Sequence, residues 1–359
     1  MSDADQRAAL LRVVVGRPGP VVPDAATWRE WKWLAQWERV APLLYQLIDL
    51  VPTDLTDEQR EEVRQLHGSV LLRCIQLEHH MLVALRLLDD HGIRGVALKG
   101  GATAHLDYPN PSWREVSDID VLIDPADRIR ALQLLRNEGW VQGYALPKGH
   151  DEFTHAVTLV KDRMELDLHQ RIGRRALGLR VPTRELLEGA VSFDVAGAEV
   201  FALNDVDRLI HSALHCVSAR GDDRRLSSVA DVLLGAHRRA DAARDVLERA
   251  ERWRVRLLVE QAVLDAFAVA QLDAPEQWVE AMRRPIHRRD RLVEGAYLSD
   301  RRARVRMELA YLRLLRGWRT RWRYVVGYFK TDSDYVQQHR RSGVRAQSRY
   351  VLAKLRGRA

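Results

Sequence analysis

The sequence contains little cysteine, and this scarcity excludes two classes of protein. It has two cysteines in 359 residues, Cys74 and Cys216, and neither has another cysteine near it in the chain. A pair separated so widely is typical neither of a disulfide-stapled domain nor of a zinc motif with closely spaced ligands. We therefore expect both cysteines to be small residues of the hydrophobic core.

Long apolar runs are also missing, and the N-terminus has no basic, apolar leader. A membrane span needs about 18 uninterrupted apolar residues, whereas the best candidate, residues 257–272, is interrupted by Glu260 and Asp265. The chain begins MSDAD, which is acidic where a secretory signal is basic, and no apolar segment follows. These features predict a cytoplasmic protein.

Acidic residues are scarce in one part of the chain only. Residues 301–359, which we call the basic tail, hold 17 Lys and Arg against three Asp and Glu, whereas the first 300 residues carry −7 of a net charge of +7. Aromatic residues are interleaved with these cations. Two interpretations remain open: the basic tail binds a polyanion such as nucleic acid or an acidic membrane surface, or its aromatics pack inward while its arginines are solvated.

The remaining composition is that of a globular protein, because 46% of the residues are apolar and 30% are charged. The patterning predicts three segments. Residues 1–91 form an N-terminal helical region, in which a long helix begins at the capping pair Thr56 and Gln59 and ends at Gly92. Residues 204–359 form a C-terminal helical domain that includes the basic tail and begins at Asn204, a residue suited to helix capping.

Between these helical segments, residues 92–203 alternate short apolar runs with helical spacing. The runs of strand length are residues 95–98, 119–123, 153–160, 164–169 and 191–202. A helix is expected from Asp124 to about Gly139. The expected fold class is α+β, with a mixed β-sheet and helices in a catalytic core flanked by the two helical segments.

A glycine pair follows the first predicted strand. Lys99, Gly100 and Gly101 stand between that strand and a short helical run at residues 102–106. Adjacent glycines at such a turn let the backbone approach a phosphate group. The same turn also occurs for purely geometric reasons, so it is not specific by itself.

Acidic residues alternate along two of the predicted strands. Asp118 and Asp120, in SDIDVLI, point to one face of their strand, about 7 Å apart, and two such carboxylates repel each other unless a cation lies between them. Asp167 occupies a similar position in ELDLH at residues 165–169. If the two strands are neighbours, the three aspartates form the carboxylate cluster of a two-metal phosphoryl-transfer site that suits Mg²⁺. Otherwise they are scattered surface acids.

These motifs resemble the nucleotidyltransferase superfamily typified by DNA polymerase beta and the aminoglycoside nucleotidyltransferases. The whole chain is more similar still to a bacterial family known only as uncharacterised nucleotidyltransferases. The similar segments are ERVAPLLYQLI at 38–48, LKGGA at 98–102, SDIDVLI at 117–123, ELDLH at 165–169, HSALHCVSARGDDRRLSSVADVLL at 211–234 and GWRTRWRYVVGYF at 317–329.

The resemblance implies a Mg²⁺-dependent enzyme that moves an NMP, expected to be AMP from ATP, to an acceptor hydroxyl or amine and releases pyrophosphate. Asp118 and Asp120 would bind two divalent metals through the NTP. Asp167 would complete the inner metal site and help to activate the acceptor. Gly100 and Gly101 would hold the β- and γ-phosphates.

Three further residues are candidates for nucleotide binding. Ser117 adjoins the aspartates. Lys99 directly precedes the glycine pair, which is a departure from the superfamily's usual turn. It either neutralises the triphosphate or lies at the end of a strand and pairs with Asp124. Arg114 either contacts the triphosphate or is a solvated loop residue.

Other residues are candidates for contacting the acceptor or for supporting the metal ligands from behind. Glu165 lies on the same strand face as Asp167 and could replace it, but the family's acid directly precedes a Leu-His pair, which favours Asp167 followed by Leu168 and His169. The family's helical half has recurrent polar positions that the resemblance places toward the cleft. In this chain they are His215, Arg225 and Asp231. His215 and Asp231 could also join His211 in a zinc site, but a packing role for the two histidines is favoured.

Two alternatives to this enzyme remain. The chain could be an RNA-binding or tRNA-modifying protein that acts through the basic tail, or a non-catalytic accessory protein that binds NTP. The intact set of three acids argues against the second. A small molecule, a peptide, a protein or an RNA end would each serve as acceptor for the predicted chemistry.

Overall fold

A computed structural model of the chain describes residues 2–143, 154–173, 177–218, 224–287, 291, 294–295, 312–313, 315 and 317–329. Its longest element is α4 (Asp57–Asp90), the long helix that the sequence predicts. The Thr56 hydroxyl accepts a hydrogen bond from the Gln59 amide, and the Gln59 side chain accepts one from the Thr56 amide. The helix ends just before Gly92, whose φ of +69° favours glycine.

Seven strands of the described part of the chain form one mixed sheet, in the order β3-β4-β5-β2-β1-β7-β6. The strands are β1 (Val96–Ala97), β2 (Ile119–Leu122), β3 (Val141–Gln142), β4 (Ala156–Lys161), β5 (Met164–His169), β6 (Val191–Val195) and β7 (Ala198–Ala202). β2 pairs parallel to β5 and antiparallel to β1. The sequence predicts most of these strands, but residues 191–202 form a hairpin, β6–β7, rather than one strand, and β3 is an addition.

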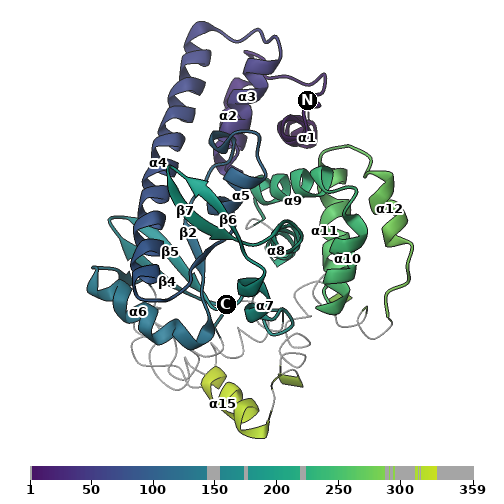
Figure 1. Cartoon of the computed structure of the whole chain (residues 1–359). Coiled ribbons are helices and arrows are strands. Elements are labelled where there is room, and N and C mark those ends of the chain that lie inside the picture. The colour runs from purple at the N-terminus through teal and green to yellow at the C-terminus, as the bar shows by residue number, and fades with distance from the viewer. Residues whose placement is uncertain are drawn as a thin grey trace.

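One face of this sheet packs against α4 and α6 (Arg128–Asn137), as Figure 1 shows for the long helix along the flank of the molecule. Ile119, Val121 and Ile123 lie in this core with Leu166 and Leu168, together with Leu77 and Leu88 of α4. The alternation expected for β2 is therefore confirmed: Ile119, Val121 and Ile123 enter this core, whereas Asp120 and Leu122 face the other side.

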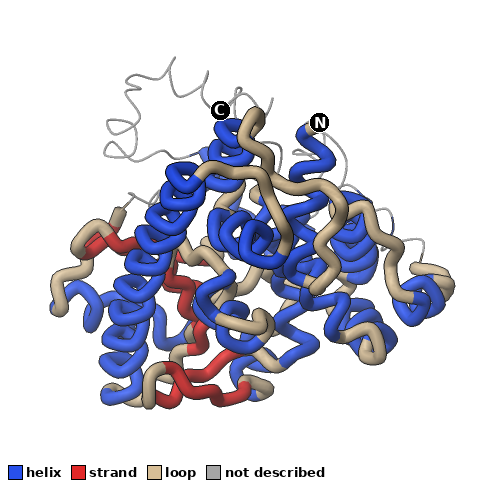
Figure 2. Tube along the Cα trace, turned by 90° about the horizontal axis from the view of Figure 1, so that it is seen from above, coloured by secondary structure: helices blue, strands red, loops and turns tan. Residues whose placement is uncertain are grey.

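A second hydrophobic core within the described residues joins helices from both ends of the chain. Its helices are α1 (Asp3–Val14), α2 (Trp28–Trp37), α3 (Ala41–Leu50), α8 (Asp205–Ser218), α9 (Leu226–Arg238), α10 (Ala243–Arg252), α11 (Arg256–Val269) and α12 (Glu276–Met282). α1 packs on α9 and α11, and Figure 1 shows α1 beside α9. In Figure 2 the larger group of helices lies to the right of the strands. The division at residues 91 and 203 stays a prediction about domains, and the two cores cut across it.

The remaining described elements are short, except for one helix in the basic tail. They are α5 (Gly100–Leu106), η1 (Pro111–Trp113), η2 (Pro125–Asp127), α7 (Thr183–Glu188) and α15 (Trp318–Phe329). α15 lies at the bottom of Figure 1. Most of the basic tail lies outside the described residues. No helix in the described ranges is both long enough and apolar enough to cross a membrane.

Candidate active site

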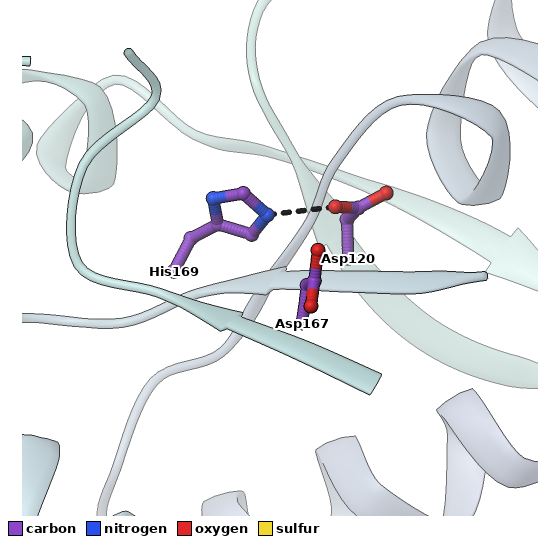
Figure 3. A group of neighbouring side chains, drawn as sticks. All are labelled: Asp120, Asp167 and His169. Atoms are coloured by element: carbon purple, nitrogen blue, oxygen red, sulfur yellow. Dashed lines mark hydrogen bonds and ion pairs between the residues drawn. The ribbon is translucent and has the colours of Figure 1, made fainter. Parts of the chain in front are cut away.

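The candidate site is built on the pairing of β2 with β5. Asp120 and Asp167 are partners in this parallel ladder, so their side chains leave neighbouring strands on the same face of the sheet. The expectation that the two acidic strands are neighbours is confirmed. His169, two residues after Asp167 on β5, also points to this face. Each of the three residues offers one ligand atom within 4.8 Å of the other two, and Figure 3 shows their side chains converging.

Asp120 is the buried centre of this group, with an exposed fraction of 3%. Its Oδ1 atom accepts a hydrogen bond from Lys99 Nζ at 2.5 Å. The same oxygen atom lies 2.7 Å from His169 Nε2. Burial alone would raise the pKa of this carboxyl, but the Lys99 ammonium and then His169 hold it well below its usual value. Asp120 is therefore ionised at neutral pH.

Lys99 reaches Asp120 from an unusual backbone conformation, with a φ of +44°. Non-glycine residues seldom adopt such angles, and they tend to do so at functional sites. The interpretation that Lys99 pairs with Asp124 is wrong, because the Asp124 carboxylate instead caps η2 by accepting the Ala126 amide at 2.8 Å. Lys99 is drawn inward because buried Asp120 needs a positive partner.

Asp118 lies just before β2 and outside the closest group, but near it. Ser117 Oγ donates to its carboxylate at 2.6 Å. Burial raises the pKa of Asp118, and the negative charge of Asp120 raises it further. Such mutual repulsion between acids is relieved when a cation lies between them. Arg39 donates from Nη1 to Ser117 Oγ at 2.7 Å, a contact that the sequence did not predict.

On β5, the structure separates the two acids that sequence reasoning left as alternatives. Asp167 is half-buried and accepts a hydrogen bond from Thr158 Oγ1 at 2.5 Å. Glu165 is exposed and is not a member of the group around Asp120. His169 is the residue that joins the group instead.

The donor set formed by Asp120, Asp167 and His169 fits a divalent metal site. Two carboxylates supply the oxygen ligands that Mg²⁺ prefers, and an imidazole nitrogen is accepted by several other divalent metals. The mutual pKa effects of the acids show that negative charge is concentrated here.

A polar cavity of about 210 Å³ opens beside the aspartates. It collects seven of the residues that sequence reasoning proposed: Lys99, Gly100, Arg114, Ser117, Asp118, His215 and Arg225. Arg39, Val116, Ser227 and Ser228 complete its lining. Residues from α5, from the loop before β2, and from the α8 and α9 regions thus meet at one cavity, although they lie far apart in the sequence.

Two of the cations in the polar cavity, Arg39 and Arg225, form no ion pair with a carboxylate among the described residues. The Arg225 guanidinium lies over the ring of Trp37, 4.2 Å from its centroid, and Trp37 stacks in turn on Trp33. Arg225 Nη1 is buried without a hydrogen-bond partner in the described part of the chain. A donor left in this state in a cavity is suited to an anionic ligand.

Arg114 is not a solvated loop residue, because it is anchored in the protein. Its guanidinium donates to both carboxylate oxygens of Asp231, at 2.7 and 2.8 Å, and Tyr108 donates to the same carboxylate at 2.9 Å. Asp231, at 8% exposure, therefore lies behind Arg114 and does not line the polar cavity, contrary to the expectation that it faces the cleft. Burial alone would lower the pKa of Arg114, but Asp231 raises it.

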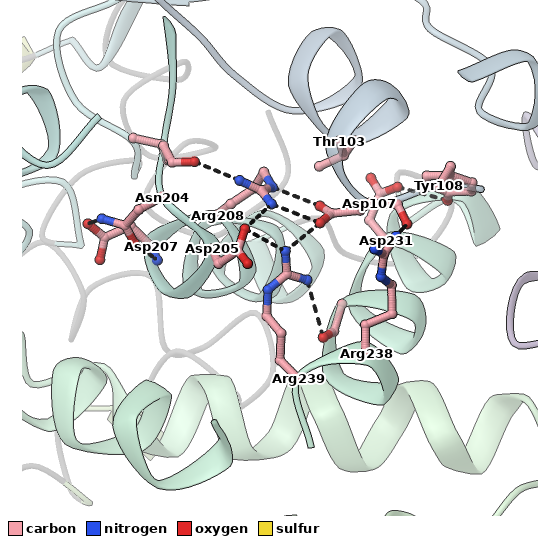
Figure 4. A network of polar contacts seen from close by, with 12 residues as sticks. Thr103, Asp107, Tyr108, Asn204, Asp205, Asp207, Arg208, Asp231, Arg238 and Arg239 are labelled. Carbon is pink, nitrogen blue, oxygen red and sulfur yellow. Dashed lines mark hydrogen bonds and ion pairs between the residues drawn. The ribbon is translucent and has the colours of Figure 1, made fainter. Parts of the chain in front are cut away.

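A second polar network, which the sequence did not predict, links the end of α5 to the C-terminal helices (Figure 4). Arg208 donates to both oxygens of Asp107, at 2.9 and 3.0 Å, and Arg239 donates to Asp107 Oδ1 at 2.5 Å. All three side chains are buried. The network fixes α5 against α8 and α9, and it thereby holds the two sides of the polar cavity together.

The glycine pair is closely packed against neighbouring side chains. A Cβ atom on Gly100 would lie 3.1 Å from Val116 Cγ2, and one on Gly101 would lie 2.8 Å from Met81 Sδ. Gly100 lines the polar cavity, whereas Gly101 packs on α4. Close helix packing is therefore an equal reason for both glycines at this turn.

A mixed sheet that carries carboxylates on adjacent strands, beside a Gly-Gly turn and a cationic cavity, fits metal-assisted phosphoryl transfer. A family model described as an uncharacterised nucleotidyltransferase matches residues 24–270, and the chain belongs to this family of enzymes. A comparison with curated proteins found no match. Membership confirms the resemblance found in the sequence, and it implies an NTP substrate.

Proposed function

We propose that this protein is a Mg²⁺-dependent enzyme that transfers AMP from ATP to an acceptor hydroxyl or amine and releases pyrophosphate. The observation that supports the proposal is the polar cavity, in which Lys99, Arg39 and Arg225 share the lining with Asp118. Lys99 also contacts Asp120, the ladder partner of Asp167. A triphosphate carries up to four negative charges, and arginine and lysine are the side chains that bind such groups.

In this proposal each residue has a distinct task. Asp118, Asp120 and Asp167 hold the metal ions, which neutralise the phosphates when bound. Lys99, Arg39 and Arg225 hold the triphosphate, with Arg114, Ser117 and the Gly100 backbone lining the cavity beside it. His169 orients Asp120 through its hydrogen bond. His215 also lines the polar cavity and would contact the nucleotide.

The reaction is an in-line displacement. The acceptor oxygen or nitrogen forms a bond to the α-phosphorus, and the bond from that phosphorus to the bridging oxygen breaks. Pyrophosphate leaves with the electron pair of the broken bond. Asp167, the half-buried acid of the group, accepts the proton that the acceptor loses.

The direct test incubates the protein with Mg²⁺, each α-labelled NTP in turn, and a cell extract separated into small-molecule, protein and RNA fractions. Label from ATP should enter one fraction with wild-type protein and with Glu165→Gln, but not with Asp167→Asn. Labelling that survives in Asp167→Asn would contradict the proposal. Labelling from another NTP alone would correct the assignment of ATP.

A second candidate function is RNA binding through the basic tail, and α15 supplies the observation that favours it. Trp318 and Trp322 are 72% and 63% exposed, and the Arg319 guanidinium lies 5.7 Å from the Trp318 ring centroid. Exposed aromatics with adjacent arginines are suited to stacking on bases. RNA affinity that falls steeply with salt and is lost in the Trp318→Ala/Trp322→Ala variant would support this function.

A further inference from the structure

A second cavity, of about 240 Å³, lies between α4 and α5, and we call it the apolar pocket. Most of its lining is apolar, with Leu71, Ile75 and Met81 from α4 and Ala104 from α5. It shares Gly100, Arg114, Val116 and Asp118 with the polar cavity. Two cavities of opposite character therefore meet at Asp118, beside the candidate metal ligands.

The charges of the apolar pocket differ from those of the polar cavity. Glu78 and Asp118 contribute carboxylates to its lining, and His105 Nε2 lies 2.7 Å from Glu78 Oε2. Among the described residues that line it, Arg114 is the one arginine, and Asp231 already binds that guanidinium through both oxygens. None of the described residues that line this pocket is a lysine or arginine without a carboxylate partner. A phosphorylated or carboxylated molecule would find no free cation here.

We propose that the apolar pocket binds the acceptor, and that the acceptor is a small uncharged or cationic molecule whose apolar body carries the reacting hydroxyl or amine. The proposal rests on the proposed function, in which the triphosphate fills the polar cavity. In-line displacement requires the attacking atom and the leaving pyrophosphate on opposite sides of the α-phosphorus. Arg39 and Arg225 line the polar cavity but are not part of the lining of the apolar pocket, so a nucleophile in the apolar pocket reaches Asp118 past a different set of residues.

Size and chemistry narrow the acceptor further. A volume of about 240 Å³ is slightly below the usual range for drug-sized ligands, which begins at roughly 300 Å³. The pocket therefore suits a molecule with a single ring or a short aliphatic chain. An RNA end or a sugar phosphate would bring anionic groups to Glu78 and Asp118, and like charges there are repelled.

Cys74 provides a direct probe, because it lines the apolar pocket, half-buried, whereas Cys216 is fully buried elsewhere. Its placement corrects the expectation that both cysteines are core residues. Burial raises the pKa of the Cys74 thiol, so we expect its alkylation by N-ethylmaleimide to be slow. The reaction is therefore run at mildly alkaline pH, and its progress is measured by the intact mass of the protein. A bound molecule should protect this thiol.

The probes are three molecules of similar shape: 2-phenylethylamine, 2-phenylethanol and phenylacetate. At about ten times its Kd, a probe that fills the pocket should slow Cys74 alkylation about tenfold. The amine and the alcohol should protect at millimolar concentration, whereas the anionic phenylacetate should not. Glu78→Gln should weaken protection by the amine but leave protection by the alcohol unchanged.

Two matched variants test where the probes bind. Ala104→Phe places a ring inside the pocket and should abolish protection, whereas Val83→Phe adds the same ring to the exposed side of α4. Binding of Mg²⁺ and ATP should remain in both variants, because the polar cavity is untouched. Amines and alcohols that protect Cys74 should then be screened as acceptors for label from ATP.

The outcomes separate this inference from the proposed function. Equal protection by phenylacetate, no protection by any of the three probes, or protection that survives Ala104→Phe would overturn the inference. Protection by ATP alone would assign the pocket to the nucleoside and would overturn it as well. If the amine protects Cys74 but no NTP is bound or consumed, the proposed function fails while the pocket's ligand chemistry stands.

Discussion

Lys99 Nζ lies 2.5 Å from Asp120 Oδ1, and the Asp120 side chain is almost entirely buried. The Lys99 ammonium group therefore places a positive charge next to Asp120, the buried central carboxylate of the candidate metal site. Asp120 is therefore a structural partner of Lys99 as well as a candidate ligand. Asp167 is therefore a better position than Asp120 for an inactivating variant, because Asp120→Asn would also weaken the fold.

Asp120→Asn should lower the free energy of unfolding by about 1–3 kcal/mol, because it removes the carboxylate that pairs with the half-buried Lys99 ammonium. The double variant Lys99→Met/Asp120→Asn should recover a substantial part of that loss. Urea unfolding of the wild type, both single variants and the double variant measures the coupling between the two residues. Losses that simply add would show that the pair does not interact in this way.

Lys99→Met should also change ligand binding in two opposite directions. Without the ammonium beside Asp120, affinity for the metal alone should rise, because the cation no longer competes for the carboxylate. Affinity for the triphosphate should fall, because one cation of the polar cavity is lost. Titration with Mn²⁺ and then with an ATP analogue measures both. Parallel losses of the two affinities would contradict this prediction.

Asp167→Asn should remove turnover at little cost in stability, because Asp167 is half-buried and its described hydrogen bond comes from a neutral hydroxyl, Thr158 Oγ1. We expect a loss of at least about a hundredfold in turnover, as for general bases. Glu165→Gln, an exposed change two residues away, should leave turnover unchanged. An equal loss in both variants would mean that Glu165 shares the role of Asp167.

The strand pattern predicted the central part of the site well, for a physical reason. Period-two alternation fixes which side chains share a face, so Asp120 and Asp167 could be placed on one side and Ile119 and Leu166 on the other. Their proximity required only that the two strands be neighbours, which the structure confirms. Helix limits at Thr56, Gly92 and Asn204 were similarly readable, because capping is a local property.

Contacts between distant segments were not readable in this way. Nothing local indicates that Arg39 reaches Ser117, or that Trp37 lies under Arg225. Asp231 was placed toward the cleft on resemblance alone, whereas its carboxylate is satisfied by Arg114 and Tyr108. Partner choice among charged residues depends on which helices meet, and that is settled by packing of the whole core.

Arg225→Ala should raise the KM for ATP by about tenfold with a smaller change in kcat. Each charge-assisted contact to a phosphate contributes about 1.5–3 kcal/mol. Trp37→Leu should produce part of this effect, because it removes the ring on which the guanidinium lies. Arg184→Ala is the matched control, since Arg184 is a highly exposed residue that pairs with Glu188. Unchanged KM in Arg225→Ala would remove this residue from the triphosphate site.

His211 should make the protein less stable in acid. It lies on α8 with 3% exposure, and burial, followed by the charges of Lys99 and His169, lowers its pKa from 6.5 to about 3. Above pH 6.5 the histidine is neutral in both folded and unfolded chains, so it adds no pH dependence. Between pH 6.5 and about 3, the unfolded chain binds a proton that the folded chain excludes. The free energy of unfolding should fall there by about 1.4 kcal/mol per pH unit from this residue.

Other groups also titrate in this range, so the useful quantity is the difference between two proteins. The stability advantage of the wild type over His211→Gln should shrink as pH falls from 6.5, because glutamine does not take up a proton in the unfolded chain. His79→Gln changes an exposed histidine on α4 and should leave the difference from wild type nearly constant. A constant difference for His211→Gln as well would mean that His211 is protonated in the folded protein, with Asp120 balancing its charge.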